Sequence, residues 1–173
     1  MTAALPFTDP VRMHQVGAGL SRRLTPDAEA SRRIARALDL QALENFVADI
    51  EVQPADDGWV LSGRVAAHAV QSCGLTLEPL PVDIDRAFSI RLVESAPEPE
   101  TDEIDLSPDE DDVDVVEDGR IDLGQYAVEQ LSLALDPFPR KAGAEFVQPE
   151  EPAEISPFAA LKALKDGDGP AGG

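Results

Sequence analysis

The sequence is poor in cysteine, histidine and aromatic side chains. Its 173 residues include 1 Cys, 2 His, 1 Trp, 1 Tyr and 6 Phe. A single cysteine excludes an internal disulfide and a four-thiolate zinc site, and it suits a reducing compartment. The chain also lacks an apolar run of about 18 residues that could cross a bilayer, and it begins without the basic head and apolar stretch of a signal peptide. We therefore expect a cytoplasmic protein with no membrane partner.

Basic residues are scarce as well. The chain has 14 Lys and Arg against 34 Asp and Glu, which gives a formal net charge of −20. The excess is local, because 13 of the acids lie within residues 94–118, whereas residues 1–50 carry 6 Arg and 6 acids. The pattern indicates a nearly balanced domain with an acidic insertion, so the net charge alone does not exclude a nucleic acid partner.

Alternation of apolar and polar residues predicts the strands. The period is two over residues 43–53 and again over residues 59–69, with turn residues at 54–58 between them, which predicts a long β-hairpin. A third strand over residues 82–92 follows a corner at Pro79–Pro81, and Arg86 interrupts its pattern, which indicates a bulge or an exposed position. Two weaker alternations, over residues 10–16 and 113–115, indicate short strands, the second one before an Asp118–Gly119 turn.

Capping residues and apolar stripes predict the helices. Thr25 is the predicted N-cap of a helix that has Pro26 at its first position and runs to about Leu38. Asp122, with Gln125 three residues later, predicts the start of a second helix, which ends at Asp136–Pro137. The two buried stripes are expected to be Ala30, Ile34, Ala37 and Leu38 in the first helix, and Leu123, Ala127, Leu131, Ala134 and Leu135 in the second. Residues 156–165 could form a third helix.

These elements predict an α+β fold. We expect an antiparallel β-sheet built on the long hairpin, with two or three packing helices and a mobile acidic loop. The expected organisation is one domain over residues 1–165, with the acidic insertion at residues 94–118 and a frayed tail at residues 166–173.

Motifs for catalysis and for metal binding are missing. Gly17–Gly19 lacks the third glycine of a dinucleotide-binding loop, and neither His14 nor His68 has a second ligand at metal-binding spacing. The acidic run at residues 109–114 lacks the glycine that a calcium-binding EF-hand loop needs at its sixth position. Cys73 has no neighbouring base to activate it, so we expect a half-buried structural residue at a strand end. We predict no catalytic residue, no metal and no cofactor, and an enzyme that acts through Cys73 is the less favoured alternative.

Five basic residues are candidates for binding RNA or another partner. Arg32, Arg33 and Arg36 share one face of the first helix, where three guanidinium groups could contact phosphates. An exposed, salt-bridged helix face would have the same sequence pattern, so both interpretations stay open. Arg140 and Lys141 follow Pro137 and Pro139, whose rings fix the backbone and would present this pair rigidly.

Two stretches of the chain resemble a known family. Residues 70–81 (VQSCGLTLEPLP) and 121–140 (IDLGQYAVEQLSLALDPFPR), the acidic spacer between them and the segment PFAALKAL at 157–164 resemble the YceD family of large ribosomal RNA subunit accumulation proteins, in its alphaproteobacterial form. The resemblance implies a role in the synthesis, processing or stability of large-subunit ribosomal RNA, and it brings no catalytic residues. Many relatives carry a second cysteine where this chain has Thr76, which argues against a metal or redox role here.

The resemblance also marks individual positions. The matched motif residues are Cys73, Leu77, Glu78, Pro79, Asp122, Leu123, Leu131, Leu133, Pro137, Pro139 and Arg140. The sequence pattern gives most of them structural roles: Pro79 makes a corner, Asp122 caps a helix and the leucines form the core. Arg140 is the exception, because no structural role is evident for it.

Two functional hypotheses follow. In the first, the protein is a noncatalytic ribosome-assembly factor that contacts large-subunit ribosomal RNA, or its precursor, through arginine-bearing faces. In the second, the acidic insertion imitates the charge of RNA and holds a basic ribosomal protein until delivery.

Overall fold

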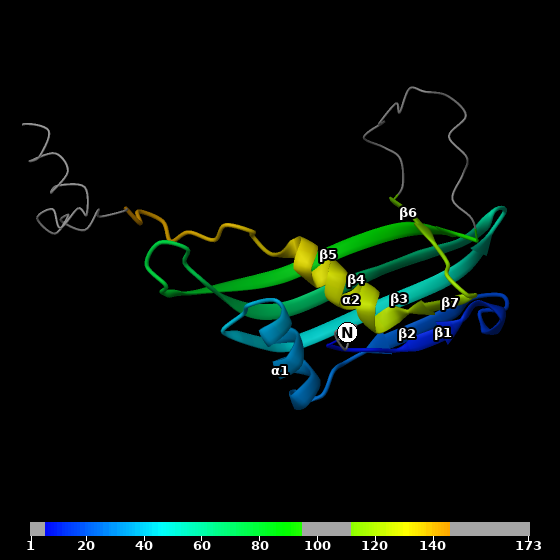
Figure 1. Cartoon of the computed structure of the whole chain (residues 1–173), viewed down its shortest axis with the longest axis horizontal. Helices are drawn as coiled ribbons and strands as arrows, with labels where there is room; N and C mark the ends of the chain where they lie inside the picture. The colour runs from blue at the N-terminus through cyan, green and yellow to red at the C-terminus, as the bar shows by residue number, and fades with distance from the viewer. Residues whose placement is uncertain (1–5, 95–111, 146–173) are drawn as a thin grey trace, which may run out of the picture.

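The computed structural model describes residues 6–94 and 112–145 of the chain (Figure 1). The predicted C-terminal helix at residues 156–165, the tail at residues 166–173 and most of the acidic insertion lie outside the described residues.

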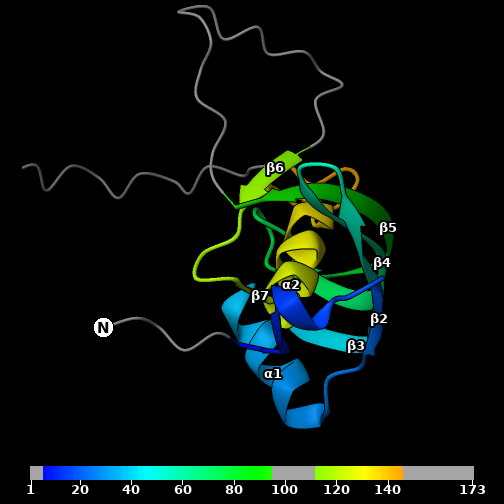
Figure 2. The ribbon, with the colours of Figure 1, turned by 90° about the vertical axis from the view of Figure 1, so that its right-hand side faces the viewer.

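The described residues form two sheets and two α-helices. In chain order the elements are β1 (Pro10–Arg12), a 3₁₀ turn (Met13–Gln15), β2 (Leu20–Leu24), α1 (Ala28–Ala37), β3 (Ala42–Ala55), β4 (Gly58–Ser72), β5 (Pro79–Val93), β6 (Asp112–Val115), β7 (Arg120–Asp122) and α2 (Leu123–Ala134). The main sheet has the strand order β2-β3-β4-β5-β6, and β1 pairs with β7 in a separate small sheet. Both helices lie on one face of the main sheet (Figures 1 and 2), which confirms the α+β class.

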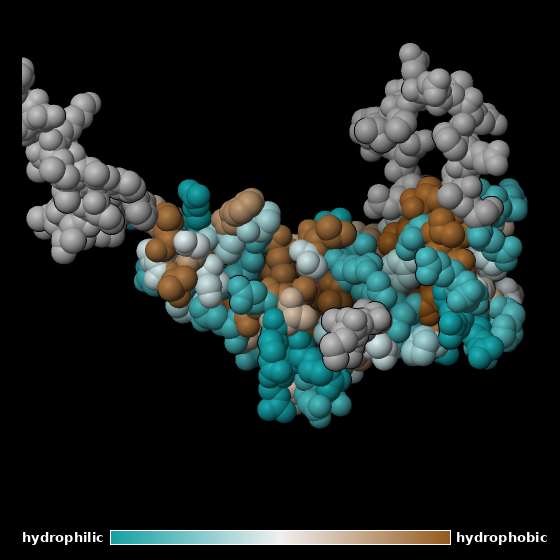
Figure 3. Space-filling model, in the orientation of Figure 1, coloured by the Kyte–Doolittle hydropathy of each residue, from teal (hydrophilic) through white to brown (hydrophobic). Residues whose placement is uncertain are grey.

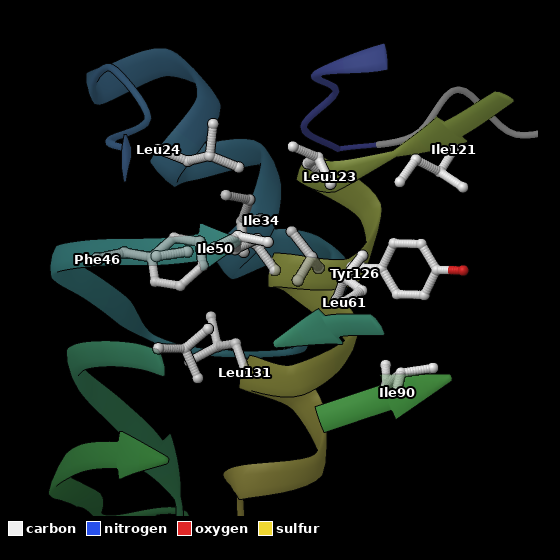
Figure 4. Close-up of a cluster of buried hydrophobic side chains, with 14 of the residues drawn as sticks. Leu24, Ile34, Phe46, Ile50, Leu61, Ile90, Ile121, Leu123, Tyr126 and Leu131 are labelled. Carbon is white, nitrogen blue, oxygen red and sulfur yellow. The ribbon is translucent and has the colours of Figure 1, made fainter. Parts of the chain in front are cut away.

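One hydrophobic core fills the space between the sheet and the helices. Ile50 of β3 and Leu61 of β4 point from the sheet toward Ile34 of α1 and Leu123 and Leu131 of α2 (Figure 4), and all five are at most 1% exposed. The apolar residues of β3 and β4 reach this core because side chains of a strand alternate between its two faces. The period of two in the sequence therefore identifies the residues that face the helices.

The sheet differs from the prediction at both edges. β6 pairs parallel with β5, so the sheet is not antiparallel throughout. A parallel pair needs a crossover of about a dozen residues or more, and residues 94–111 between these strands are enough for one. β2 was not predicted, because only its first and last residues are apolar. The predicted first strand is shorter than residues 10–16, since the 3₁₀ turn begins at Met13.

Of the two alternatives predicted at Arg86, the exposed position is confirmed and the bulge is not, and the predicted corner at Pro79 is wrong. Pairing of β4 with β5 is unbroken past Arg86, which lies opposite Val65, so Arg86 is exposed but makes no bulge. The irregularity lies instead between Glu44 and Val47 in β3, where Asn45 has a positive φ of 54°. Pro79 belongs to β5 and not to a corner. A proline is tolerated there because it is the first residue of the strand. β6 pairs only with Ile90–Val93 of β5, so no described strand on that side needs a backbone N–H at Pro79.

The helix caps are partly as predicted. Asp122 caps α2, because its carboxylate accepts hydrogen bonds from the backbone N–H groups of Gln125 (3.1 Å) and Asp9 (2.8 Å). The cap of α1 is Asp27 and not Thr25, and it accepts from Ala30 N at 2.7 Å. The backbone of Asp27 is extended (φ −70°, ψ 174°), as is usual at an N-cap, so α1 begins after Asp27 and not at Pro26. The apolar stripe of α1 also differs, since Ala35 is buried and Ala37 is exposed.

A side-chain hydrogen bond attaches the edge strand β6 to α2. The hydroxyl of Tyr126 donates to the carboxylate of Asp114. Burial of the phenol and the neighbouring carboxylate both raise the pKa of Tyr126 above its ordinary value. The tyrosine therefore stays protonated at neutral pH and serves as a donor to Asp114.

Gly63 in β4 is a position where no side chain fits. A Cβ atom at this residue would lie 2.5 Å from the carbonyl oxygen of Asp49 and 2.9 Å from the ring of Phe88, which is its partner on β5. We predict that Gly63→Ala lowers the free energy of unfolding by about 1–3 kcal/mol, because the central strand must shift. Gly74→Ala is the matched control, since its Cβ would meet Pro139 O at an ordinary 3.6 Å. Denaturant titration of both variants tests this, and equal stability would contradict it.

Candidate functional site

Two distant parts of the chain join at one end of the main sheet. The turn between β4 and β5 contacts the segment that follows α2 (Figure 1). The N–H of Gly74 donates to Pro139 O at 2.8 Å, and the side chain of Gln71 donates to Asp136 O at 2.8 Å. We call residues 71–78 and 136–141 together the junction.

A groove of about 440 Å³ runs along the junction. Its walls come from the end of α1, the β4–β5 turn and the end of α2, and they include Leu38, Asp39, Leu77, Leu135, Pro137 and Pro139. Cys73 lies at the base of the groove. The groove is therefore built largely from the junction itself.

Cys73 is the hydrogen-bonding centre of the junction. It is completely buried (0% exposed) and not half-buried as predicted. The backbone N–H of Lys141 donates to its sulfur at 3.4 Å. The hydroxyl of Thr76 and the backbone N–H groups of Leu75 and Thr76 lie near the sulfur and also favour its thiolate form. These donors stabilise the thiolate and outweigh burial, so that the pKa of Cys73 falls from 9.0 to about 6. The sulfur therefore acts as an anionic acceptor that holds Lys141 against the turn.

An ion pair adds a second link across the junction. Lys141 Nζ lies 2.8 Å from Glu78 Oε1, and the hydroxyl of Thr76 donates to the other oxygen of Glu78 at 2.9 Å. The ammonium of Lys141 lowers the pKa of Glu78, and the carboxylate in turn raises the pKa of Lys141. Both groups are about half exposed, so the pair orients the segment more than it stabilises the fold.

Two of the motif leucines are exposed, contrary to the prediction that all of them form the core. Leu123 and Leu131 are buried, but Leu77 is 74% exposed and Leu133 is 60% exposed. Leu77 also has a positive φ of 59°, which is costly for a residue with a branched side chain. Phe138, between the two prolines of the junction, is 78% exposed. Figure 3 shows apolar surface over this end of the molecule.

The five predicted basic residues differ in whether their side chains have an ion-pair or hydrogen-bond partner. Arg33 pairs with Glu29 at 2.8 Å, and Lys141 pairs with Glu78. Arg32 donates to the carbonyl of Ala28 at 3.0 Å. Within residues 6–94 and 112–145, the side chains of Arg36 and Arg140 make no hydrogen bond and no ion pair. Arg36 and Arg140 are therefore the cations that remain available at this end.

The structure brings most of the predicted basic residues to the same end of the molecule. Arg32 and Arg36 line a second groove, of about 510 Å³, between α1 and the start of β3. Asp39 lines this groove and also the groove of the junction, so the two are neighbours. The sequence analysis did not identify Asp39 and Asp136 as residues of the site, although it placed the end of the second helix at Asp136. The carboxylate of Asp136 accepts from Phe138 N at 2.9 Å and shapes the turn before Arg140, which the Asp-Pro pair could have signalled.

A comparison with protein families places the chain. A family model described as "Large ribosomal RNA subunit accumulation protein YceD" matches residues 61–165. The match contains both halves of the junction. The chain belongs to the YceD family. Neither a curated protein nor a solved structure matches it.

The family match confirms the YceD resemblance found in the sequence, though not its alphaproteobacterial form, and links the chain to the accumulation of large-subunit ribosomal RNA. The YceD signature stretches are the two segments that hydrogen-bond to each other at the junction. None of the helices in the described part of the chain is long and apolar enough to cross a membrane.

The thiolate of Cys73 gives a prediction for this YceD protein. Because Cys73 is the only cysteine, the ultraviolet absorbance of its thiolate can be followed during a pH titration. We expect a midpoint near pH 6 in the folded protein, against 9.0 for an ordinary thiol. Since the folded state binds this proton less tightly than the unfolded state, stability should rise as the pH increases between these two values.

Thr76→Val is the variant that tests the cause. It removes the hydroxyl that contributes most to lowering the pKa of Cys73, so the midpoint should move upward. Thr25→Val, at an exposed position remote from the junction, should leave the midpoint unchanged. A wild-type midpoint close to 9 would contradict the assignment of Cys73 as an anionic acceptor.

Proposed function

We propose that this YceD protein is a noncatalytic assembly factor that contacts large-subunit ribosomal RNA, or its precursor, through the basic rim of the junction. The observation that carries the proposal is that Arg140 has a fixed backbone and, in the part of the chain that the structure describes, an unpaired side chain. Its backbone is held by the junction, and its guanidinium has no partner among the described residues. The membership of the YceD family supports the RNA partner.

The junction suits Arg140 to phosphate recognition. Pro137 and Pro139 restrict the backbone before it, and the hydrogen bonds of Gly74 and Cys73 fix the residues on either side of it. A guanidinium presents five donors in a planar fork that matches the oxygens of a phosphate. Arg36, at the same end of the molecule, adds a second available cation.

The state of Cys73 supports a noncatalytic role. A nucleophilic thiolate must be reached by its substrate, and it needs a free lone pair. The sulfur of Cys73 is buried and accepts the backbone N–H of Lys141. Its low pKa is better explained by its role as a hydrogen-bond acceptor in the junction than by a role as a catalytic nucleophile.

A second candidate function rests on the acidic insertion. The 13 acids of residues 94–118 could hold a basic ribosomal protein by charge complementarity. This function predicts that Arg140 has no part in binding. The effect of Arg140 on RNA binding therefore separates the two candidates.

The test is the salt dependence of RNA binding by Arg140→Ala. We expect weaker binding to fragments of large-subunit ribosomal RNA, with the slope of log affinity against log salt reduced by about one, because one phosphate contact is lost. The melting temperature should not change. Arg140→Lys should restore the slope but not the full affinity, since an ammonium cannot bind a phosphate with two parallel hydrogen bonds.

Arg23→Ala is the matched control for this experiment. It removes the same charge, but Arg23 is paired with Asp49 at 3.1 Å and lies on β2, away from the junction. Its salt slope should equal that of the wild type. An unchanged slope for Arg140→Ala, together with a lowered melting temperature, would overturn the RNA contact and favour the acidic insertion as the binding element.

A further inference from the structure

A cleft of about 330 Å³ lies at the opposite end of the main sheet from the junction. Its lining includes Arg12 and His14 near β1, Trp59 at the start of β4, and Arg120 of β7. Trp59 and Cys73 are at the two ends of β4, so the cleft and the junction are roughly 45 Å apart along the strand, at about 3.3 Å per residue. The cleft shares no lining residue with the groove of the junction.

Two arginines face each other across the small sheet at the cleft. Arg12 and Arg120 are direct partners in the β1–β7 pairing. Like charges at opposed positions of two strands are destabilising, so this pair costs stability unless an anion lies between the two guanidinium groups. Asp118 compensates only in part, because its carboxylate is 3.8 Å from Arg120 and is largely exposed. Among the described residues, no hydrogen bond or ion pair involves the side chain of Arg12.

The aromatic wall of the cleft is fixed in place. Trp59 is partly buried and packs against the hydrophobic core, so its indole is anchored while part of it remains accessible in the cleft. A fixed aromatic side chain beside arginines is typical of sites where proteins stack an unpaired nucleic acid base. His14 adds a further hydrogen-bonding group at the rim.

The two acidic residues of the cleft limit what can bind. Glu94 and Asp118 also line it, so a free anion such as inorganic phosphate would be repelled as well as attracted. A nucleotide satisfies both charges, because its phosphate can lie at the arginines while N–H groups of its base donate to a carboxylate. The volume of the cleft is at the lower end of the range for small-molecule sites, which suits a single nucleotide.

We infer that this cleft binds one unpaired nucleotide of RNA, with the base on Trp59 and the phosphate between Arg12 and Arg120. The inference rests on the proposed function, since it adds a second RNA contact far from Arg140. It specifies single-stranded RNA, because a base inside a duplex cannot leave its stack to reach the indole without a cost in free energy.

The experiment uses the fluorescence of Trp59, which is the only tryptophan of the chain. The full chain is titrated with a single-stranded RNA of about twelve nucleotides that carries a terminal dye, and tryptophan fluorescence and dye anisotropy are recorded together. We expect RNA to quench Trp59 with the same midpoint as the anisotropy. Arg12→Ala and Arg120→Ala should each weaken binding by about tenfold, consistent with the loss of one nucleotide contact.

Three controls make the outcome specific. Arg23→Ala removes an equal charge far from the cleft and should retain most of the affinity. Trp59→Phe keeps an aromatic ring in the core and should weaken binding less than the arginine variants. Arg140→Ala should bind more weakly but still show quenching when saturated, because the cleft is intact.

The possible failures are distinguishable. Anisotropy that reports RNA binding without quenching, together with wild-type affinity of Arg12→Ala and Arg120→Ala, would overturn the cleft and leave the contact at Arg140 standing. Equal quenching by a duplex of the same sequence would overturn the unpaired nucleotide. If the anisotropy shows no RNA binding at all, the proposed function itself fails.

Discussion

The hydrogen bonds between the β4–β5 turn and the chain after α2 are the constraint on which the candidate site depends. Cys73 and Lys141 are 68 residues apart, and the sulfur of one accepts the backbone N–H of the other. The segment from Pro137 to Arg140 belongs to no helix or strand, so these bonds and its two prolines are what define its conformation. A thiolate suits this position because its negative charge strengthens the hydrogen bond that it accepts from the backbone N–H of Lys141.

The uncovered face of the sheet carries charged residues of both signs. Charged residues on this face neutralise each other across the strands, as Arg23 does with Asp49 and Arg64 with Asp85. His68 contacts Asp83 in the same way at 2.7 Å. In the described residues, Arg12 at the cleft and Arg32, Arg36 and Arg140 near the junction have no carboxylate partner, and neither have Arg22 of β2 and Arg86 of β5. The two RNA contacts proposed above lie near the two ends of β4.

The sequence predicted those parts of the fold that depend on local patterns. The strands β3, β4 and β5 follow from a period of two, and α2 follows from the cap at Asp122 and its apolar stripe. The parallel pairing of β6 and the existence of β2 depend on contacts between distant residues, which local patterns do not record. The cap of α1 was misplaced at Thr25 because Thr and Asp are both favoured N-cap residues and the observed cap, Asp27, lies only two positions later.

The candidate site was predicted less completely than the fold. The resemblance identified Cys73 and Arg140, and the two prolines indicated that Arg140 is presented rigidly. The sequence indicates the pair of Arg33 with Glu29, which lies four residues before it, but not the pair of Lys141 with the distant Glu78, so Lys141 looked equivalent to Arg140. The exposure of Leu77 was missed because an isolated leucine in a turn has no periodic pattern that marks its face.

The most direct test of the account is to crosslink the protein to RNA in large-subunit precursors with ultraviolet light and to map the crosslinked peptides by mass spectrometry. Contact at both ends of the sheet predicts crosslinks in the peptides that contain Arg140 and Trp59, because these residues lie at the junction and at the cleft. Crosslinks confined to the uncovered face of β3, β4 and β5, or crosslinks to a ribosomal protein without any to RNA, would contradict it.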